Sequence, residues 1–464
     1  MKKIFVSMGL AAVGTASLQA AYAPDLTSMD SSKTWGMWNV SATLRGFYDD
    51  NYATSGSGGQ SGSVGFEFSP SLNVYVPLQQ TELGLRYTYG LYYYQEREQL
   101  GQTPIDQTHQ IDLWVDHAFS ERWRMRIADT FAVAQEPELL SPGGVVSVPG
   151  RVEGNNIVNS GTITLHTDWT RQFSTELGYQ NGFYDYENSG ATVTYPTPLT
   201  IIYDPNPPHN PIGIIPGSPG SVDSSLAGLL NRIEQSAWLN LQWQVQPETM
   251  VLAGGRFGLV NYTGDEPVAI FSPGPYYSSY LLYHSSDRDN RSYFGYVGFS
   301  HVFLPNLFVS FQGGVQYTES YNDPLSSPSL APYVVMSASY TYSPGNYAQV
   351  GFTQSRNATD VITPDASGRI TQDQETSVLF ASLNHHFTPK LLGTLIGHLQ
   401  YSTFNEGAFA NEAELFYNFG LNLSYTINPH LSADVGYNFD YLSSQIPGRT
   451  YQRNRAYVGF TAAY

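Results

Sequence analysis

Apolar and polar residues alternate one by one along most of the chain. In the segment 83–93 every odd-numbered residue is Leu or Tyr, and Glu82, Arg86 and Thr88 hold the even positions. A period of two places successive side chains on opposite faces of a β-strand. Comparable segments recur from residue 40 to the end of the chain, and none keeps the 3.6-residue period of a helix. The pattern predicts an all-β protein whose strands have one apolar and one polar face.

The connections between these segments alternate in length. One set is very short and often reads apolar-x-Pro-x-Leu, as in 303–307, 387–391 and 427–431; proline presets the backbone for such a tight turn. The other set is longer and rich in Gly, Pro and polar residues, with 187–231 the longest. About eight short turns and about nine loops give about 18 strands (16–18), and short periplasmic turns alternating with long extracellular loops are typical of transmembrane barrels. We therefore predict a single transmembrane antiparallel up-and-down β-barrel with both termini in the periplasm.

The longest loop, residues 187–231, could take one of three positions. Residues 187–231 are proline-rich and include two apolar pieces, 201–203 and 212–216. Loops of this length usually have a function of their own or are disordered. Residues 187–231 either fold into the lumen as a constriction, cover the outer mouth, or pack on a neighbouring subunit. The segment 136–155, with apolar pairs of its own, is a second candidate for a lid.

The N-terminus has the features of an export signal. Lys2 and Lys3 precede an apolar stretch, 4–18, which is followed by small residues. This pattern predicts a signal peptide over residues 1–20, with cleavage between 20 and 23. We expect a short periplasmic lead over 21–37 and the barrel over 38–464.

Composition narrows the possible functions. The 464 residues are 13% charged and 14% aromatic, with a mean hydropathy of -0.26; no long apolar run follows the N-terminus, which excludes helical membrane spans. The absence of cysteine removes disulfides and thiolate metal sites. The formal charge of -18 argues against nucleic acid as a partner. No hydrolase, metalloprotease or nucleotide-binding motif is present, so we expect no enzyme activity, catalytic residue, cofactor or metal.

The polar face supplies the candidate functional residues, which we predict to line the lumen. They are Arg45, Glu67, Glu82, Arg86, Asp112, Asp116, Arg124, Arg126, Arg256, Asp434, Asp440, Arg453 and Arg455. Closure of the barrel would place the last strand beside the first and gather charges on one wall, opposite a neutral arc over 310–402. Such a wall orients polar solutes in a pore. Equally, these residues form cross-strand ion pairs that stiffen the barrel.

Asp129 does not fit this arrangement. It falls on the apolar phase of Trp123, Ile127 and Phe131. A carboxylate that faces lipid is costly, so we expect a β-bulge or a position near the headgroups.

The closing stretch 451–464 resembles the last strand of bacterial outer-membrane β-barrels. Ala456, Val458, Phe460 and Tyr464 share an apolar face that ends on an aromatic residue. In such barrels this pattern is the signal read by the assembly machinery, and here Phe460 and Tyr464 would form it.

A second resemblance lies near the start of the chain. The stretch 110–120, Q-I-D-L-W-V-D-H-A-F-S, followed by 123–129, W-R-M-R-I-A-D, is similar to the families named putative β-barrel porins. This resemblance implies a barrel in the bacterial outer membrane, with lipid, the assembly machinery and small hydrophilic solutes as partners, and it leaves a homotrimer open.

The sequence thus favours a porin or channel for passive diffusion of small hydrophilic solutes through a water-filled lumen. The alternative is a non-conducting or plugged surface barrel with an adhesion or structural role.

Overall fold

The computed structural model describes residues 37–56, 58–141, 144–274 and 279–464. The predicted signal peptide, and the predicted lead up to residue 36, lie outside the described residues.

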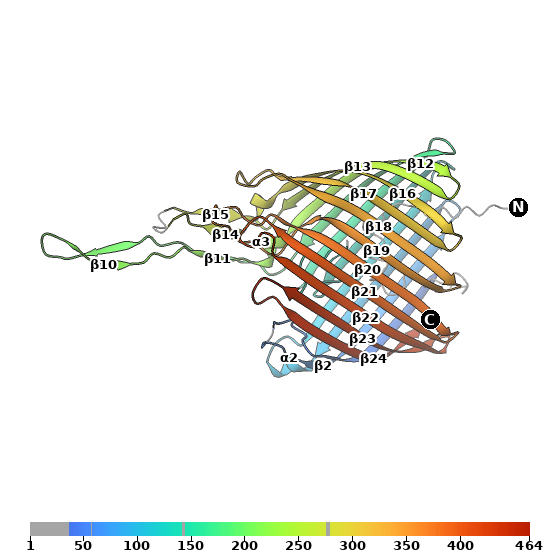
Figure 1. Cartoon of the computed structure of the whole chain (residues 1–464). Coiled ribbons are helices and arrows are strands. Elements are labelled where there is room, and N and C mark those ends of the chain that lie inside the picture. Colours follow the sequence, from blue (N-terminus) through green and yellow to red (C-terminus); the bar gives the residue numbers. More distant parts are fainter. Residues whose placement is uncertain (1–36, 57, 142–143, 275–278) are drawn as a thin grey trace.

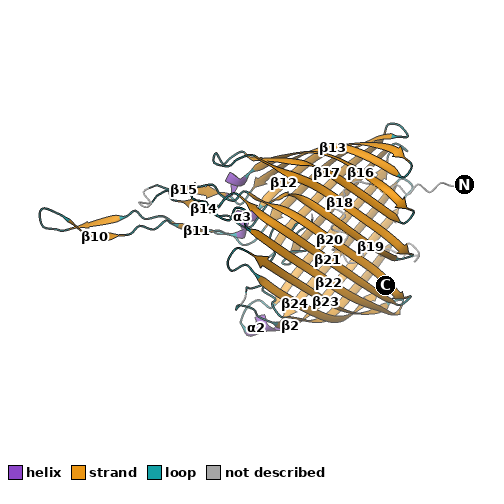
Figure 2. Ribbon diagram, in the orientation of Figure 1, coloured by secondary structure: helices purple, strands orange, loops and turns teal. Residues whose placement is uncertain are grey.

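Within those residues, eighteen strands form one closed antiparallel sheet (Figures 1 and 2). The strands are β1 (Trp38–Asp49), β2 (Ser63–Pro77), β3 (Thr81–Tyr94), β4 (Ile105–Ala118), β5 (Trp123–Ala134), β6 (Asn156–Asp168), β7 (Phe173–Asp185), β12 (Arg232–Gln246), β13 (Thr249–Tyr262), β16 (Asn290–Leu304), β17 (Leu307–Ser320), β18 (Ser329–Ser343), β19 (Asn346–Asn357), β20 (Asp373–Thr388), β21 (Leu391–Asn405), β22 (Ala413–Asn428), β23 (Leu431–Ser444) and β24 (Tyr451–Ala463). Each strand pairs with the next one around the barrel, and β24 closes it against β1. The predicted all-β barrel and its strand number are confirmed.

The start of β1 and the end of the chain meet at one rim of the barrel. The Val40 amide donates to the Tyr464 carbonyl at 3.0 Å, and the Tyr464 amide donates back at 2.9 Å. Short turns such as 305–306 and 389–390 lie at this rim, which we call the terminal rim. The longer connections lie at the opposite rim, called the distal rim (Figure 1).

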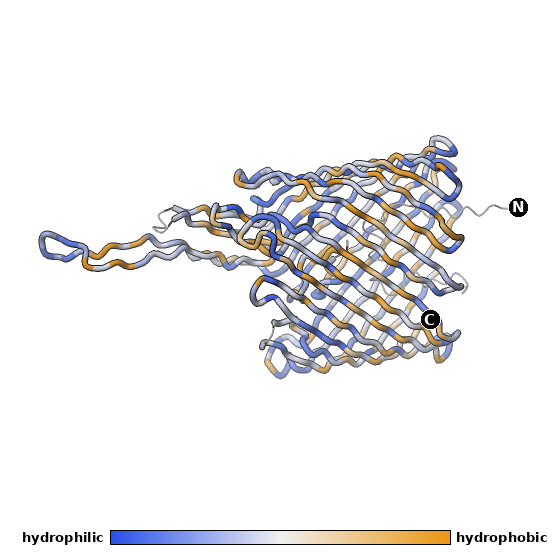
Figure 3. Tube along the Cα trace, in the orientation of Figure 1, coloured by the Kyte–Doolittle hydropathy of each residue, from blue (hydrophilic) through white to orange (hydrophobic). Residues whose placement is uncertain are grey.

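The outer surface of the barrel is apolar because the alternation along each strand turns one set of side chains outward (Figure 3). Leu44, Leu177, Val297 and Val458 are each more than half exposed. No helix among the described residues is both long enough and apolar enough to cross a membrane.

Asp129 lies on this outer face without a bulge, so the expected irregularity is wrong. Its register with Leu113 on one side and Gly161 on the other is continuous. The Asn159 amide of the next strand lies 3.1 Å from both carboxylate oxygens. A hydrogen bond from a neighbouring side chain thus satisfies the Asp129 carboxylate, and the strand needs no bulge to turn it away from the outer face.

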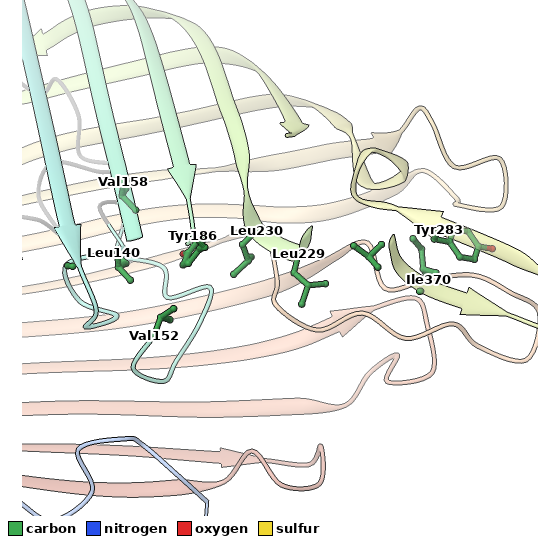
Figure 4. Packing of buried hydrophobic residues seen from close by; sticks show 11 residues of the cluster. Leu140, Val152, Val158, Tyr186, Leu229, Leu230, Tyr283 and Ile370 are labelled. Carbon is green, nitrogen blue, oxygen red and sulfur yellow. The ribbon is translucent and has the colours of Figure 1, made fainter. Parts of the chain in front are cut away.

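The distal rim bears short additional elements. They are α2 (Gln95–Gln99), β8 (Thr192–Thr194), β9 (Thr200–Tyr203), β10 (Pro211–Ile215), β11 (Ser221–Asp223), α3 (Leu226–Leu230), β14 (Pro267–Phe271), β15 (Leu281–His284) and the 3-10 helix η1 (Ser285–Arg288). Buried residues from several of these loops meet in one cluster, in which Leu140, Leu230, Tyr283 and Ile370 pack together (Figure 4). Ala134 of β5 and Val158 of β6 belong to the same cluster, so the rim loops pack onto the ends of these barrel strands.

The longest connection, 187–231, does not fold into the lumen. Strand β8 pairs with β11, and β9 pairs with β10, so the segment forms a long hairpin that projects beyond the distal rim (Figure 1). Only the last part of this connection, which includes α3, packs into the cluster at the distal rim. The constriction suggested for this loop is therefore wrong, and a different loop occupies the lumen.

Candidate permeation pathway

Residues 135–141 and 144–155, which belong to the connection between β5 and β6 at the distal rim, turn inward and cross the lumen. We call these residues the inner loop. They contact β21, β22, β23 and β24, which we call the far wall. A cavity remains on the side of the barrel from β6 to β19.

Charged groups fix the start of the inner loop to the closing strand. Glu136 accepts from both terminal nitrogens of Arg453, at 2.7 and 3.1 Å, and from Arg455 at 3.3 Å. Asp49, at the end of β1, is fully buried and accepts from the Nε atoms of the same two arginines, at 2.9 and 3.1 Å. Two cations therefore lie between two carboxylates, and charge-assisted hydrogen bonds of this kind are the strongest available to side chains.

Neutral hydrogen bonds hold the middle of the inner loop. Gln400 of β21 binds both peptide groups of Val146: its Oε1 accepts from the amide at 2.7 Å and its Nε2 donates to the carbonyl at 2.7 Å. Two residues earlier in both segments, His398 Nε2 lies 2.8 Å from the Gly144 carbonyl oxygen. The wall thus satisfies loop peptide groups that would otherwise be buried without partners.

The returning part of the inner loop is held by an ion pair and by apolar contacts. Arg151 donates to Asp106 at 2.6 Å, and Arg97 donates to the same carboxylate at 2.8 Å. Val146 packs against Phe416 and Tyr451 in a buried cluster on the far wall. Both ends and the middle of the loop are therefore attached.

Glu138 adds a titratable contact. The Asn418 side chain donates to its Oε1 at 2.6 Å. Burial raises the pKa of Glu138 to about 8, and the carboxylates of Asp440 and Glu136 contribute to the rise.

The open side of the lumen is a cavity of about 200 Å³ between the inner loop and the wall from β6 to β19. Leu140, Val145 and Ser147 border it from the loop, and Arg256 and Phe294 border it from the wall. The cavity therefore lies on one side of the barrel.

Most of the charges predicted from sequence lie in ion pairs between strands. Arg45 of β1 contacts Glu67 of the neighbouring β2 at 3.4 Å and reaches across β24 to Asp434 of β23 at 2.7 Å. Arg86 contacts Asp112 at 2.6 Å, and Arg126 lies 3.9 Å from Asp116. Arg453 also lies 3.7 Å from Asp440, and with 3% exposure it is buried beneath the inner loop.

Three other predicted residues have different surroundings. Glu82 lies opposite Asp116 in the register of β3 and β4. Arg124 lies opposite Ala118 near the terminal rim. Arg256 lines the cavity.

The partners that the inner loop uses were not predicted from the sequence. Asp49 was not among the predicted pore-lining residues, Glu136 and Glu138 lie in the segment predicted as a second lid, and Gln400 lies in the predicted neutral arc. The apolar pairs of segment 136–155 were the one visible signal. In the part of the chain that the structure describes, no three His, Asp or Glu residues are grouped so as to hold a metal ion.

Comparisons with known proteins give one family match and several similar solved structures. The model of the family described as Putative beta-barrel porin 2 matches residues 284–464. Similar solved structures include OccAB4 of Acinetobacter baumannii, with 10% identity over 93% of this chain and 99% of that chain and a TM-score of 0.39. OccK3 (OpdO) of Pseudomonas aeruginosa has 10% identity over 92% and 96%, with a TM-score of 0.41. The outer membrane protein opdK of the same organism has 9% identity over 92% and 99%, with a TM-score of 0.40. None of the curated protein sequences matches this chain.

The matched residues include strands β16–β24 and the closing seam of the barrel. A porin-type match on a closed 18-stranded barrel identifies an outer-membrane β-barrel of the channel type. The same two observations favour a non-enzymatic role.

Proposed function

We propose that this outer-membrane barrel is a channel through which small hydrophilic solutes diffuse passively, along the cavity between the inner loop and the β6–β19 wall. The observation that carries the proposal is the one-sided position of the inner loop. It binds to the far wall and leaves a cavity of about 200 Å³ beside it. A partly obstructed, water-accessible lumen restricts solutes by size and by the charges that line it.

The pore-lining role of the predicted charges belongs to this proposal. Arg256 acts directly on a passing solute because it borders the cavity. Arg453 and Arg455 act through the inner loop, whose position they fix. The cross-strand ion pairs, such as Arg86 with Asp112, keep the wall rigid.

The cellular setting is proposed as follows. The signal peptide is removed, the terminal rim faces the periplasm, and the hairpin faces outward. The assembly machinery recognises Phe460 and Tyr464, which are exposed on the outer face of the last strand. The barrel catalyses no reaction, and self-association as a homotrimer is compatible with this arrangement.

A non-conducting barrel with an adhesive role is the second candidate. The projecting hairpin favours it, because Ile212 and Ile214 are 62% and 64% exposed on a segment that no barrel strand covers. Exposed apolar groups of this kind mark contact surfaces.

Conductance in planar lipid bilayers distinguishes the two candidates. Protein refolded in detergent, and shown to be folded by its heat-modifiable electrophoretic mobility, should insert with discrete current steps. Folded protein that inserts without steps would contradict the channel and leave the adhesive role. Protein denatured before addition is the control.

A further inference from the structure

Three exposed cations at the terminal rim have no carboxylate partner among the described residues. Arg122, Arg171 and Lys390 lie in the short turns of this rim, and none of them forms an ion pair within 4.0 Å. At the distal rim, by contrast, Arg369 pairs with Asp365 at 3.0 Å. Although the chain has a net charge of -18, positive charge is therefore available where the barrel meets one leaflet of the membrane.

Two of these cations, Arg122 and Arg171, lie on adjacent turns. The Asp168 amide, just before the turn of Arg171, donates to the Arg122 carbonyl at 2.9 Å. Within the second turn the Thr170 hydroxyl accepts from the Phe173 amide at 2.9 Å. Hydrogen bonds thus hold side by side the two backbone segments that carry the guanidiniums.

Two indole rings lie beside these cations. Trp123 directly follows Arg122 along the chain and is 40% exposed. Trp169 lies two residues before Arg171 and is 53% exposed. The two ring centres are 5.9 Å apart, with the ring planes inclined at 70°. Because tryptophan prefers the level of the lipid headgroups, this pair marks the depth at which a headgroup contacts the barrel.

The charges around the two turns suit a ligand with one negative charge. Glu121 is an exposed carboxylate of the first turn, and the Asp168 carboxylate lies 3.1 Å from His166 Nε2. Two guanidiniums beside the Glu121 carboxylate leave an excess of positive charge. Arginine binds phosphate with two parallel N–H donors. A headgroup with one phosphate diester and no ammonium group of its own would balance this excess, whereas a zwitterionic headgroup would bring a further cation.

Apolar side chains continue from the indole pair along the outer face of the barrel wall. In the register of β5, β6 and β7, Leu165 pairs with Met125 on one side and with Leu177 on the other. Leu177 is 55% exposed, and Ile163 in the next outward position of β6 is 46% exposed. The acyl chains of a lipid whose headgroup lies at the two turns would contact this apolar band.

We propose that turns 119–122 and 169–172 form a binding site for an anionic glycerophospholipid. Arg122 and Arg171 bind the phosphate, and the Trp123–Trp169 pair contacts the glycerol region above the acyl chains. The site lies on the membrane side of the terminal rim, outside the lumen, so it does not depend on conduction.

Native mass spectrometry of the folded protein in detergent tests the site. The probes are equal amounts of phosphatidylglycerol and phosphatidylcholine with identical acyl chains. The wild type should bind more phosphatidylglycerol. The double variant Arg122→Gln, Arg171→Gln should bind phosphatidylglycerol about tenfold more weakly, because charge-assisted contacts are lost, and phosphatidylcholine as before. The corresponding double lysine variant should keep part of the binding. Lys390→Gln, which removes an exposed cation from another turn of the same rim, is the matched control and should behave as the wild type.

Heat-modifiable electrophoretic mobility shows that each variant is folded. Equal binding of phosphatidylglycerol by the double glutamine variant and the wild type would overturn the site. An equal loss in Lys390→Gln would assign the binding to the general charge of the rim, and equal binding of the two lipids would overturn the preference for an anionic headgroup. Displacement of the lipid by inorganic phosphate at the same concentration would assign the two arginines to a free ion. A barrel that binds the lipid but does not conduct would defeat the proposed function alone.

Discussion

The inner loop and the projecting hairpin are both long connections at the distal rim, yet one enters the barrel and the other leaves it. The inner loop presents Glu136, Glu138 and exposed peptide groups to a wall that holds matching arginines and amides. The hairpin pairs with itself, and its apolar residues, such as Ile212 and Ile214, stay exposed. The difference teaches that specific polar partners, more than apolar content, bring a loop into a polar lumen.

The physical reason lies in the lumen wall. Buried polar groups are costly without partners, so a loop enters only if it satisfies the groups that it covers. Asp49 is fully buried beside Arg453, and this pair needs the second carboxylate that Glu136 brings. Among the described residues, no contact joins the β9–β10 hairpin to the charged groups of the lumen wall.

Excision of each loop tests this comparison most strongly. Replacing residues 139–150 with a short Gly-Ser linker should raise single-channel conductance roughly threefold, because the loop no longer narrows the lumen. Excision of 195–220, joined across the paired residues Thr194 and Ser221, should leave conductance within about a fifth of the wild-type value. If excision of 195–220 raised the conductance and replacement of 139–150 did not, the hairpin and not the inner loop would be the segment that narrows the lumen.

Removing one cation of the closing seam has the next largest effect. Arg453→Gln leaves Asp49 and Glu136 facing each other with Arg455 alone, and breaking a buried ion pair costs about 3–5 kcal/mol. Urea unfolding, followed by heat-modifiable mobility, measures this loss of stability. Arg291→Gln is the matched control: it breaks the half-exposed pair with Glu319 on the outer face and should cost less than about 1 kcal/mol. Similar losses for both variants would mean that the seam does not depend on its buried charges.

Loss of the neutral anchor should release only the middle of the inner loop. Gln400→Leu removes both hydrogen bonds to Val146 and leaves two peptide groups without these partners, at about 1–3 kcal/mol. The current should then flicker between two levels as the loop detaches. Gln242→Leu alters an equally buried glutamine that contacts Ser174 of a neighbouring strand, and its current should stay steady. A steady current in both variants would show that the loop does not need this anchor.

A smaller effect should follow pH through Glu138. The pKa of this carboxyl is raised to about 8 when the loop is docked, whereas in a detached loop it would have its ordinary, lower value. The docked state therefore binds the extra proton, and docking weakens as pH rises from that ordinary value to about 8. Current flicker should increase over this range, and Glu138→Gln, which keeps an acceptor for Asn418, should remove the dependence. A pH dependence that survives in Glu138→Gln would assign it to another group.

The barrel could be predicted from the sequence because the features that specify it lie within each hairpin. The two-residue period and the alternation of turn and loop lengths repeat in every hairpin, so each segment is independent support for the same fold. The pattern in 451–464 from which we predicted an assembly signal at Phe460 and Tyr464 is local in the same way.

The position of the inner loop could not be predicted from the sequence, because the residues that fix it are far apart in the chain. Glu136 and Arg453 are 317 residues apart, and Val146 and Gln400 are 254 apart. Nothing in residues 135–155 distinguishes a loop that binds the far wall from one that covers the mouth. The proline-rich hairpin drew attention by its length, although its exposed apolar residues have no site in the lumen.

The position of the inner loop also has a consequence for how the molecule is made. Its main anchors, Arg453 and Arg455, belong to β24, the strand that closes the barrel against β1. Contacts between such distant residues form late in folding. A barrel still open at its seam has no site for the loop and would remain wide. We therefore expect the inner loop to take its place only after the barrel has closed.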